Sequence, residues 1–416
     1  MLSIDHLPPE ILAEIGIFFA HEAFHPPIQL LYVCRAWRDT LLCSPPCWSA
    51  LSIRCSSDPS CRSIPIITSW IDRSRLSPLF LSLDFGETDE RPVPLLQPSA
   101  SVLPRQRGRM SELVVSDVSG WHLWNLVHLW PAPNLRSFAL VRHHDGRRSS
   151  PFLPPLELLE FPLFLRDDPQ APALATLYLT HCRLLDPPRC ELSAVGDLSL
   201  LYTSSSLPTL RRTLASTPNV LRLELGPVGI EPDSSVVGTA HSSIQPPPPP
   251  PPPRLSLKHV WSMKIQLEVS SIPLLDHLLT PSLTHLTLAA TVTRSCLDTI
   301  STFLAQTHLP ISYLGITLIG SYSVHGLALI LPALPTLQTL HVSVRHVSFH
   351  PLAVTNQSSL ETFKIQFEPP PKSTRHWEEL FYDQPDYQVS GKLFPDRQVS
   401  LSPPFVHLTR FLAAPS

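Results

Sequence analysis

The sequence predicts an α/β protein in which a small module of three helices precedes a solenoid of short, irregular repeats. Two observations lead to this prediction. Apolar residues recur at helical spacing through about the first fifty residues, and a short apolar phrase typical of a strand recurs along most of the remaining chain. The chain has 416 residues, 43% of them apolar, which is enough for more than one packed region.

The first predicted helix begins at a pair of prolines, Pro8 and Pro9. Proline lacks a backbone N–H donor, and the first amides of a helix have no partner within the helix, so proline suits this position. Apolar residues then follow at a spacing that predicts a single apolar helix face, made by Ile11, Leu12, Ile15, Phe18 and Phe19.

The second predicted helix spans about residues 30 to 41 and ends before Pro45 and Pro46. Trp48 and Leu51 follow the prolines as apolar anchors of a third short piece. The apolar positions of the second helix are Leu30, Val33, Cys34, Trp37 and Leu41, and the charged residues on its other side are Arg35, Arg38 and Asp39.

Residues 4–53 carry three motifs that together resemble an F-box, the adaptor-binding module of ubiquitin-ligase substrate receptors. The motifs are LPPEIL from Leu7, VCRAWRD from Val33 and PPCW from Pro45. With the repeats described below, the chain resembles F-box proteins of the basidiomycete type that carry irregular leucine-rich repeats. This resemblance covers about an eighth of the chain.

The resemblance implies binding to a Skp-type adaptor and, through it, to a cullin. Some residues of the family pattern must also form the core of so small a module, and Trp37 fits either role. Carried onto this sequence, the pattern assigns adaptor binding to Leu7, Pro8, Ile11, Leu12, Val33, Cys34 and Trp37.

Two further elements follow the module. Apolar residues at helical spacing predict an amphipathic helix over residues 64–76, and strict alternation over residues 79–85 predicts a strand. A helix followed by a strand is how a repeat array would begin, so we place the solenoid at residues 64–367.

The repeated phrase is an apolar residue, two others, an apolar residue, one other and a third apolar residue. Seven of the nine steps between successive copies are 21–28 residues, within the range of about 20–29 for leucine-rich repeats. No single repeat can bury its apolar stripe alone, so neighbours should stack. An ordinary α/β domain with leucine-rich strands is the alternative. The copies begin at Met110, Leu135, Leu174, Val195, Val220, Leu283, Ile311, Leu337 and Leu360, and a poorer copy begins with Leu257 and Val260.

Partner binding is expected on the strand face of the solenoid. Side chains alternate along a strand, so the residue between the last two apolar positions should point outward, and stacked strands should bring these residues into one row. The asparagine that usually ladders between such repeats is missing from almost every copy, so regular curvature is not expected. The row consists of Tyr178, Glu224, Thr287, Gly315, His341 and Lys364.

Two insertions and a tail interrupt or follow the phrases. Loops are expected near residues 142–172 and 227–254, and the second contains the proline run 246–253, which predicts polyproline II. That run could dock on an aromatic-lined groove or act only as a stiff insertion. Residues 368–416 are expected to form a C-terminal cap or tail, with one helix around Trp377.

Composition and motifs argue against several function classes. A formal net charge of −3 gives no reason to expect nucleic acid or a membrane surface as partner, and no signal peptide or long apolar run is present. We therefore expect a cytoplasmic or nuclear protein whose eight cysteines are free thiols. The spacings of Cys43, Cys47, Cys55 and Cys61 are poor for a structural zinc site.

No catalytic pattern was found either. The glycines lack the lysine of a phosphate-binding loop, and no nucleophile elbow occurs. His143, His144 and Asp145 are expected in a solvated loop. We expect no enzyme activity, cofactor or metal. The sequence therefore favours the substrate-recognition subunit of a Skp-cullin-F-box ubiquitin ligase, with a leucine-rich-repeat scaffold that joins no ligase as the alternative.

Overall fold

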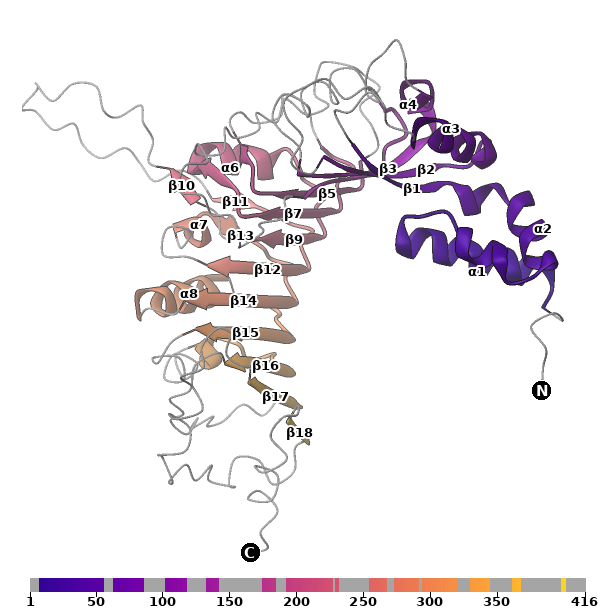
Figure 1. The fold of residues 1–416 in the computed structure, drawn as a ribbon. Helices are drawn as coiled ribbons and strands as arrows, with labels where there is room; N and C mark the ends of the chain where they lie inside the picture. Colours follow the sequence, from indigo (N-terminus) through magenta and orange to yellow (C-terminus); the bar gives the residue numbers. More distant parts are fainter. Residues whose placement is uncertain are drawn as a thin grey trace, which may run out of the picture. The chain divides into compact units, whose positions relative to one another are not determined.

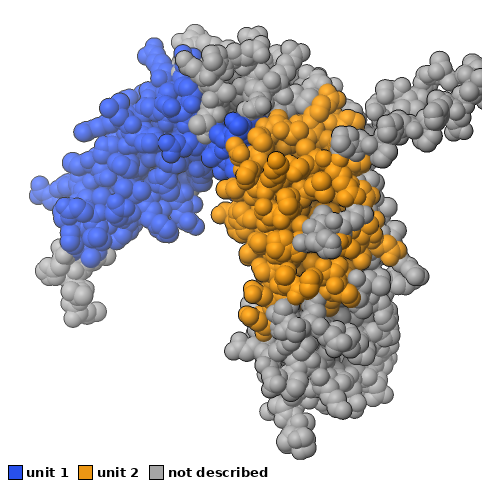
Figure 2. Space-filling model, turned by 180° about the vertical axis from the view of Figure 1, so that it is seen from behind, with its two compact units in different colours: residues 1–197 blue, residues 198–416 orange. Residues whose placement is uncertain are grey.

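The fold is described from a computed structural model. It describes residues 7–55, 63–85, 102–117, 132–141, 174–184, 192–226, 229–231, 254–267, 273–291, 294–307, 309–319, 330–344, 361–367 and 398–401. The chain divides into two compact units, residues 1–197 and 198–416 (Figure 2), and each is considered by itself.

The first unit begins with four helical pieces: α1 (Pro9–Ala23), the 3-10 helix η2 (Ile28–Tyr32), α2 (Arg35–Cys43) and the 3-10 helix η3 (Pro45–Trp48) (Figure 1). The prediction of one continuous helix over residues 30–41 is therefore wrong. Cys34 is fully extended, with φ −159° and ψ 177°, so its conformation separates η2 from α2. Apolar periodicity continues across this break because both pieces face the same core.

The core of these helices contains five side chains with relative exposures of 0–4%: Leu12, Trp37, Leu41, Cys47 and Trp48. α1 approaches α2 closely at Gly16, where an added Cβ would overlap Leu41 Cδ2 and lie 3.0 Å from Cys47 Sγ. Glycine at this position therefore sets the distance between the two helices.

Five parallel strands form the sheet of the first unit, and they are neighbours in chain order. Helix α3 (Ser63–Ser74) connects the first two. The strands are β1 (Ala50–Arg54), β2 (Leu79–Asp84), β3 (Met110–Ser116), β4 (Ser137–Val141) and β5 (Thr176–Thr180). Strand β1 was not predicted, and it places the start of the sheet within residues 4–53, before the expected boundary at residue 64. Short elements of this unit are α4 (Val102–Arg105), η5 (Arg107–Arg109) and β6 (Arg183–Leu184).

Trp48 joins the helices to this sheet. It is 1% exposed and occupies the first apolar position of a phrase continued by Leu51 and Ile53 of β1. Its indole N–H donates to the backbone oxygen of Leu41 at 2.9 Å, as a second donor beside the Ser44 N–H at 3.3 Å, at the end of α2. The guanidinium of Arg73, from α3, lies 4.7 Å from the centre of the Trp48 ring.

The main strands of the second unit follow the same rule. They are adjacent in chain order, and from β9 to β18 they pair in parallel. The strands are β7 (Asp197–Leu201), β9 (Arg222–Leu225), β12 (Ser262–Leu267), β14 (His285–Thr291), β15 (Tyr313–Ile319), β16 (Thr339–Val344), β17 (Thr362–Phe367) and β18 (Gln398–Leu401).

Helical and short extended segments return the chain between these strands, and the helices lie along one side of them (Figure 1). The helical segments are α6 (Leu207–Ala215), α7 (Pro273–Asp276), α8 (Arg294–Thr307) and the 3-10 helix η8 (Leu331–Ala333). The short strands β8 (Ser204–Ser206) and β10 (Gly229–Glu231) pair in parallel, as do β11 (Leu255–Ser256) and β13 (Leu278–Leu279).

The repeated phrase matches the strand register. We number its six residues 1 to 6, so that positions 1, 4 and 6 are apolar. Position-4 residues face one another across neighbouring strands, as Leu286, Leu314 and Leu340 do. Their exposed fraction is 0%. Burying such a side chain contributes roughly 1.5–3 kcal/mol, so these stripes hold each unit together.

One copy of the phrase begins three residues later than predicted. Met263 pairs with Leu223 on one side and Leu286 on the other, so the copy starts at Val260 and not at Leu257. Leu257 instead occupies the turn before the strand, where Thr217 and Thr280 stand in other repeats. The turn residue is itself buried, at 2% exposure for Leu257, and an apolar residue there imitates the start of a phrase.

Backbone hydrogen bonds link successive repeats where the asparagine ladder is missing. The carbonyl of position 2 accepts the N–H groups of positions 2 and 3 of the next repeat. For example, Trp261 O accepts from Thr284 N and His285 N, both at 3.0 Å. The carbonyls of Arg136, Ala175, Leu221, Thr284, Ser312 and Gln338 do the same. Because this link uses only backbone atoms, it constrains no side-chain identity at position 2.

Several predicted segments lie outside the described residues: the loop at 142–172, the proline run 246–253 and the helix around Trp377. The expected tail contains one described element, β18, whose Val399 and Leu401 pair with Phe363 and Ile365. The sequence has Asp396 at position 1 of this copy, which hid it from the apolar pattern.

Replacing Gly16 by alanine should destabilise the first unit by about 1–3 kcal/mol, because Leu41 is fully buried and cannot easily move away from a new Cβ. The matched control is Gly108→Ala, since a Cβ at Gly108 has no atom within 4 Å. Chemical denaturation, with hydrogen exchange of α1 and α2 as the local readout, should separate the two variants. Equal stability of both variants would contradict the close approach at Gly16.

Replacing Trp48 by phenylalanine should cost about 0.5–1.5 kcal/mol, because the Leu41 carbonyl loses one of its two donors and keeps only the backbone N–H of Ser44, at 3.3 Å, while most of the apolar contact remains. Trp261→Phe makes the same change at a position that is 37% exposed and serves as control. Unfolding midpoints measured under identical conditions test this. A Trp48→Phe variant as stable as Trp261→Phe would show that the bond to Leu41 is dispensable.

Candidate functional site: an apolar helical surface and a strand face

The residues assigned to adaptor binding divide into two groups. Pro8, Ile11 and Val33 are exposed, with 46% for Ile11 and 48% for Val33, while Leu7 and Cys34 are partly buried against the helical core. Leu12 and Trp37 are only 3% and 4% exposed. These last two belong to the core and can support a binding surface only through the residues they hold in place.

The expected single apolar face of α1 is two faces. Leu12, Gly16 and Ala20, at intervals of four residues, point into the core. Ile11, Ile15 and Phe18 lie on a different face and are 46%, 38% and 71% exposed. Both sets have helical spacing, so periodicity alone could not separate them. The two small residues mark the face that packs closely.

Exposed apolar residues continue beyond α1. Ile28, Tyr32 and Val33, in η2 and directly after it, are 37%, 78% and 48% exposed. We call the set Ile11, Ile15, Phe18, Ile28, Tyr32 and Val33 the N-terminal apolar surface. Ile28 and Tyr32 were not among the predicted site residues, although both stand within the resembling segment. Single exposed apolar residues are common, but several in one small module suggest an interaction surface.

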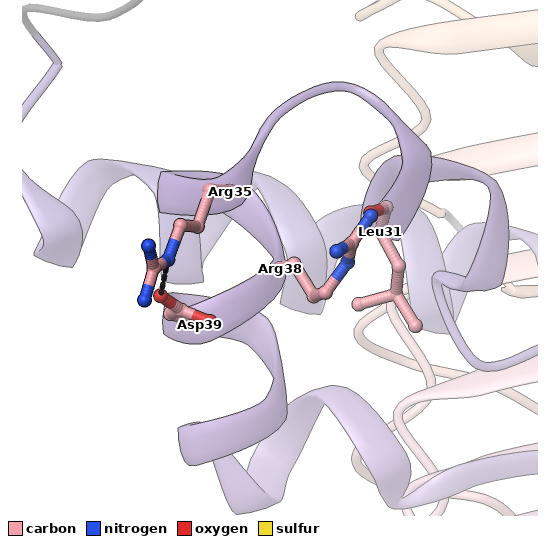
Figure 3. A network of polar contacts seen from close by, with 4 residues as sticks. All are labelled: Leu31, Arg35, Arg38 and Asp39. Carbon is pink, nitrogen blue, oxygen red and sulfur yellow. Dashed lines mark hydrogen bonds and ion pairs between the residues drawn. The ribbon is translucent and has the colours of Figure 1, made fainter.

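Polar contacts on α2 fix the segment that presents Tyr32 and Val33 (Figure 3). Arg38 Nε donates to the backbone oxygen of Leu31 at 3.2 Å and so satisfies a carbonyl at the end of η2. Arg35 and Asp39 form an ion pair of 3.6 Å one turn apart. Their side chains are 92% and 65% exposed, so this pair contributes little to stability.

Two titratable groups hold α1 against its neighbours. Cys47 Sγ donates to Ala13 O at 3.6 Å, and burial raises the pKa of this thiol, which keeps it protonated. The His21 ring meets Phe80 of β2 edge-on, with 4.4 Å between ring centres. Burial lowers the pKa of His21, because the charged form loses hydration in this contact.

The outward row of the second unit is present in the strand register. From β9 to β17, position 5 of each phrase holds Glu224, Lys264, Thr287, Gly315, His341 and Lys364, and each residue pairs with the next across neighbouring strands. Lys264 was missed because the phrase at Leu257 was assigned three residues too early. Tyr178 holds the same position in the first unit, opposite Ala139. It is therefore not grouped with the others.

The Glu224 carboxylate already interacts with two neighbouring side chains. Lys264 Nζ lies 2.6 Å from Glu224 Oε1, and Ser199 donates its hydroxyl to Glu224 Oε2 at 3.1 Å. Gly315 is buried, and a Cβ there would lie 3.2 Å from Thr287 Oγ1 and 3.4 Å from the Tyr313 ring. The row therefore leaves Thr287 and His341 more available to a partner than Glu224, Lys264 or Gly315.

Within the described ranges, no group of three or more histidine, cysteine, aspartate or glutamate side chains is placed to hold a metal ion. Cys43 is exposed, whereas Cys47 and Cys55 are buried, and all three are free thiols. Burial raises the pKa of Cys182 to about 12, so that thiol is unreactive. None of the helices seen in the described segments combines the length and apolar character that a membrane crossing needs.

Comparison with known proteins adds little. No family model matches the chain, and no curated protein is similar to it. Among solved structures, the chain is similar to a crystallised protein from Bacteroides fragilis, with 10% identity and a TM-score of 0.27. The match covers 63% of this chain and 66% of that protein. A likeness this weak carries no argument about fold or function.

The first unit should lose stability in acid through His21. A histidine whose pKa is lowered by folding contributes stability that is complete above its ordinary value of 6.5 and is lost as the pH falls below it. His21→Phe keeps an aromatic contact with Phe80 and removes the titration. Denaturation midpoints of both proteins at about pH 7.5 and 5.5 should show the larger acid loss in the wild type. An identical loss would mean that protonated His21 is accommodated without cost.

Proposed function

We propose that this protein is the substrate-recognition subunit of a Skp-cullin-F-box ubiquitin ligase. Its N-terminal helices act as an F-box that binds the adaptor, and its strands form an irregular leucine-rich-repeat solenoid that holds a protein substrate. It has no catalytic role of its own; it raises the effective concentration of substrate near a ubiquitin-charged enzyme. The observation that carries the proposal is the N-terminal apolar surface.

Three features of the helices support the adaptor half. The motifs LPPEIL, VCRAWRD and PPCW occur in the order the F-box resemblance requires. The helices form their own core around Leu12 and Trp37, so the exposed residues are not needed for folding. Ile11, Ile15 and Phe18 share one face of α1, which suits the buried apolar anchors that dominate protein interfaces.

The repeat register supports the substrate half. Positions 1, 4 and 6 are buried in copy after copy, which leaves positions 2, 3 and 5 facing away from the core. Step lengths, parallel pairing in chain order and the backbone links between repeats all fit a leucine-rich-repeat array. A strand face of this kind is broad and shallow, which suits a protein partner better than a small substrate.

The alternative function is a leucine-rich-repeat scaffold that assembles no ligase. The same apolar helical surface would then bind another partner, or bind the adaptor without a cullin. Recovery of the adaptor without any cullin, from cells that contain both, would favour this alternative.

Replacing both Ile11 and Phe18 by serine should abolish adaptor binding while the protein stays folded, because both side chains are exposed. Loss of two interface anchors should weaken binding by at least about 30-fold, the equivalent of roughly 2 kcal/mol. The measurement is co-purification with adaptor and cullin from cells, followed by the dissociation constant with purified adaptor. A Leu12→Ala change is unsuitable as a test, because loss of that buried side chain would itself destabilise the module by about 2–5 kcal/mol.

The matched control is Ile66→Ser with Leu76→Ser, which removes two apolar side chains, 49% and 89% exposed, from the same unit but outside the N-terminal apolar surface. The control should bind adaptor like the wild type. Normal adaptor binding by the folded Ile11/Phe18 variant would refute the F-box assignment.

A further inference from the structure

Exposed arginines gather at one edge of the first unit, where η5 packs on the end of α3. The guanidinium of Arg109 donates from Nη2 to Ser74 Oγ at 2.7 Å, and from Nε and Nη2 to Ser77 O at 3.0 and 2.7 Å. These bonds hold η5 against the residues that follow α3, and so bring together arginines that are distant in the sequence. We call the three exposed ones the basic patch: Arg75, Arg105 and Arg107.

The described residues supply no ion-pair partner to the basic patch. Their ion pairs engage Arg35, Arg54 and Lys264 instead. Arg109 uses its guanidinium in the bonds that fix the patch, so it sets the geometry and is not offered to a partner. The three patch guanidinium groups are therefore available to an anionic partner.

Four carboxylates occur in the described part of the chain from α3 to the end of β3, but only two lie near the patch. Asp72 is exposed on α3, and Glu112 is half-buried on β3, where burial raises its pKa and disfavours its charged form. Asp84 and Asp117 lie at the carboxyl ends of β2 and β3, whereas the patch precedes the amino ends of these parallel strands. The length of a strand, roughly 17 Å or more here, separates the two edges, and charges that far apart are largely screened. The amino edge is therefore positive although the whole chain has a net charge of −3.

Arg75 has a backbone conformation that arginine does not favour. Its φ is 49°, in the left-handed region, directly after the last residue of α3. Glycine is the usual residue at such a helix end, because it lacks a Cβ. The next residue, Leu76, is 89% exposed. A strained backbone and a leucine in water do not help folding, so both indicate that these two side chains are used at the surface.

An open hollow of about 710 Å³ adjoins the basic patch. Leu42, at the end of α2 and 38% exposed, lines one side of it. Thr68, Asp72 and Arg75 line the side formed by α3 and the residue after it. The hollow therefore combines an apolar wall with a cationic rim, and it suits an apolar side chain that has carboxylates for neighbours.

We propose that the basic patch and this hollow bind an acidic peptide segment of a partner protein, with one apolar side chain of that segment in the hollow, next to Leu76. A guanidinium group can hold a carboxylate through two parallel hydrogen bonds, which gives such a contact direction as well as charge. The inference goes beyond the proposed function, because it needs neither the adaptor nor a substrate on the strand face.

Nucleic acids and anionic membranes also attract cations, but the geometry favours a peptide. Single-stranded nucleic acid stacks on exposed rings. The rings of the described residues between α3 and β3 are Trp70, Phe80 and Phe85, and each is half-buried or buried. A lipid surface is flat and leaves a hollow unfilled, and lipid-binding clusters usually contain about four to eight cations, more than this patch has.

The test presents the purified full chain to an immobilised library of random peptides of about eight residues, and measures affinities for the best binders in solution. Bound peptides should be enriched in aspartate and glutamate and should carry one large apolar residue. Arg107→Glu should weaken the best peptide by at least about tenfold, because an attraction becomes a repulsion. Raising the salt from about 0.15 M to about 0.5 M should also weaken it.

Arg75→Gly gives a readout that a merely structural role would not. Glycine adopts the left-handed conformation without strain, so the unfolding midpoint should be at least that of the wild type. The affinity for the best peptide should nevertheless fall by at least about threefold, because a patch guanidinium is lost. Wild-type affinity in this variant would contradict a role for Arg75 in binding.

The matched control is Arg35→Glu, the same charge reversal at a side chain of this unit that is 92% exposed and outside the patch. It should alter peptide affinity less than about twofold. Bound peptides no more acidic than the library, or an Arg107→Glu variant that binds like the control, would overturn the inference. So would a single-stranded oligonucleotide or a vesicle with a third of its lipid anionic that binds the patch more tightly than the best peptide.

The chain has an acidic stretch of its own between β2 and α4, which lies outside the described residues. Its neutral variant carries Glu87→Gln, Asp89→Asn and Glu90→Gln. We expect this variant to bind the best peptide like the wild type. An affinity more than about tenfold higher would show that the chain's own segment occupies the patch, and the partner would then be excluded.

Two double variants distinguish this inference from the proposed function. The Ile66/Leu76 variant should keep adaptor recovery and lose peptide affinity, whereas the Ile11/Phe18 variant should lose adaptor recovery and keep peptide affinity. If the wild type recovers no adaptor but still selects acidic peptides, the ligase role fails and the basic patch stands. If Arg107→Glu loses the adaptor, the patch belongs to the adaptor-binding surface and this inference fails.

Discussion

In the first unit, the packing of the helices and the sheet depends on Trp48, which covers the exposed end of the apolar stripe at the first strand, β1. A repeat buries its apolar stripe only against a neighbour, so the first repeat of an array needs a different cover. The Trp48 side chain provides this cover, because it occupies position 1 of the first phrase and also belongs to the helical core. Its bond to Leu41 O and the overlying Arg73 tie α2 and α3 to the same ring. Trp48 therefore connects the helical core to the first strand of the sheet.

The place of Trp48 between the helices and the first strand explains part of what the sequence could not predict. The buried positions of the phrases, the parallel order and α3 followed because period-two and period-3.6 apolar patterns are direct consequences of backbone geometry. Strand β1 was missed because Trp48, Leu51 and Ile53 were interpreted as the end of the helical module and not as a phrase. Leu257 was assigned wrongly because the turn before each strand has its own buried position, which most repeats fill with a small or polar residue. The break at Cys34 leaves no mark in the apolar pattern.

The same limit applies to the candidate sites. On α1, the apolar residues on two faces obey the same helical period, so the sequence predicted one face where the structure has two. Residue size distinguishes them: Gly16 and Ala20 allow close packing, whereas Phe18 is too large for that side and remains 71% exposed. Leu12 and Trp37 were assigned to a surface because the family motif contains them, yet motif membership does not separate residues that contact a partner from residues that hold the contact residues in place.

The six positions of the repeated phrase are of two kinds: buried positions that stabilise the array, and exposed positions that do not. Positions 1, 4 and 6 are fixed by burial, and the link between repeats at position 2 uses only backbone atoms, so exposed side chains at positions 2, 3 and 5 can vary without loss of the array. The second unit uses that freedom unevenly. It places rings and a guanidinium in contact from Arg222 to Tyr313. The asparagine ladder of regular arrays is replaced by backbone bonds at position 2, which leave the side chains at that position unconstrained.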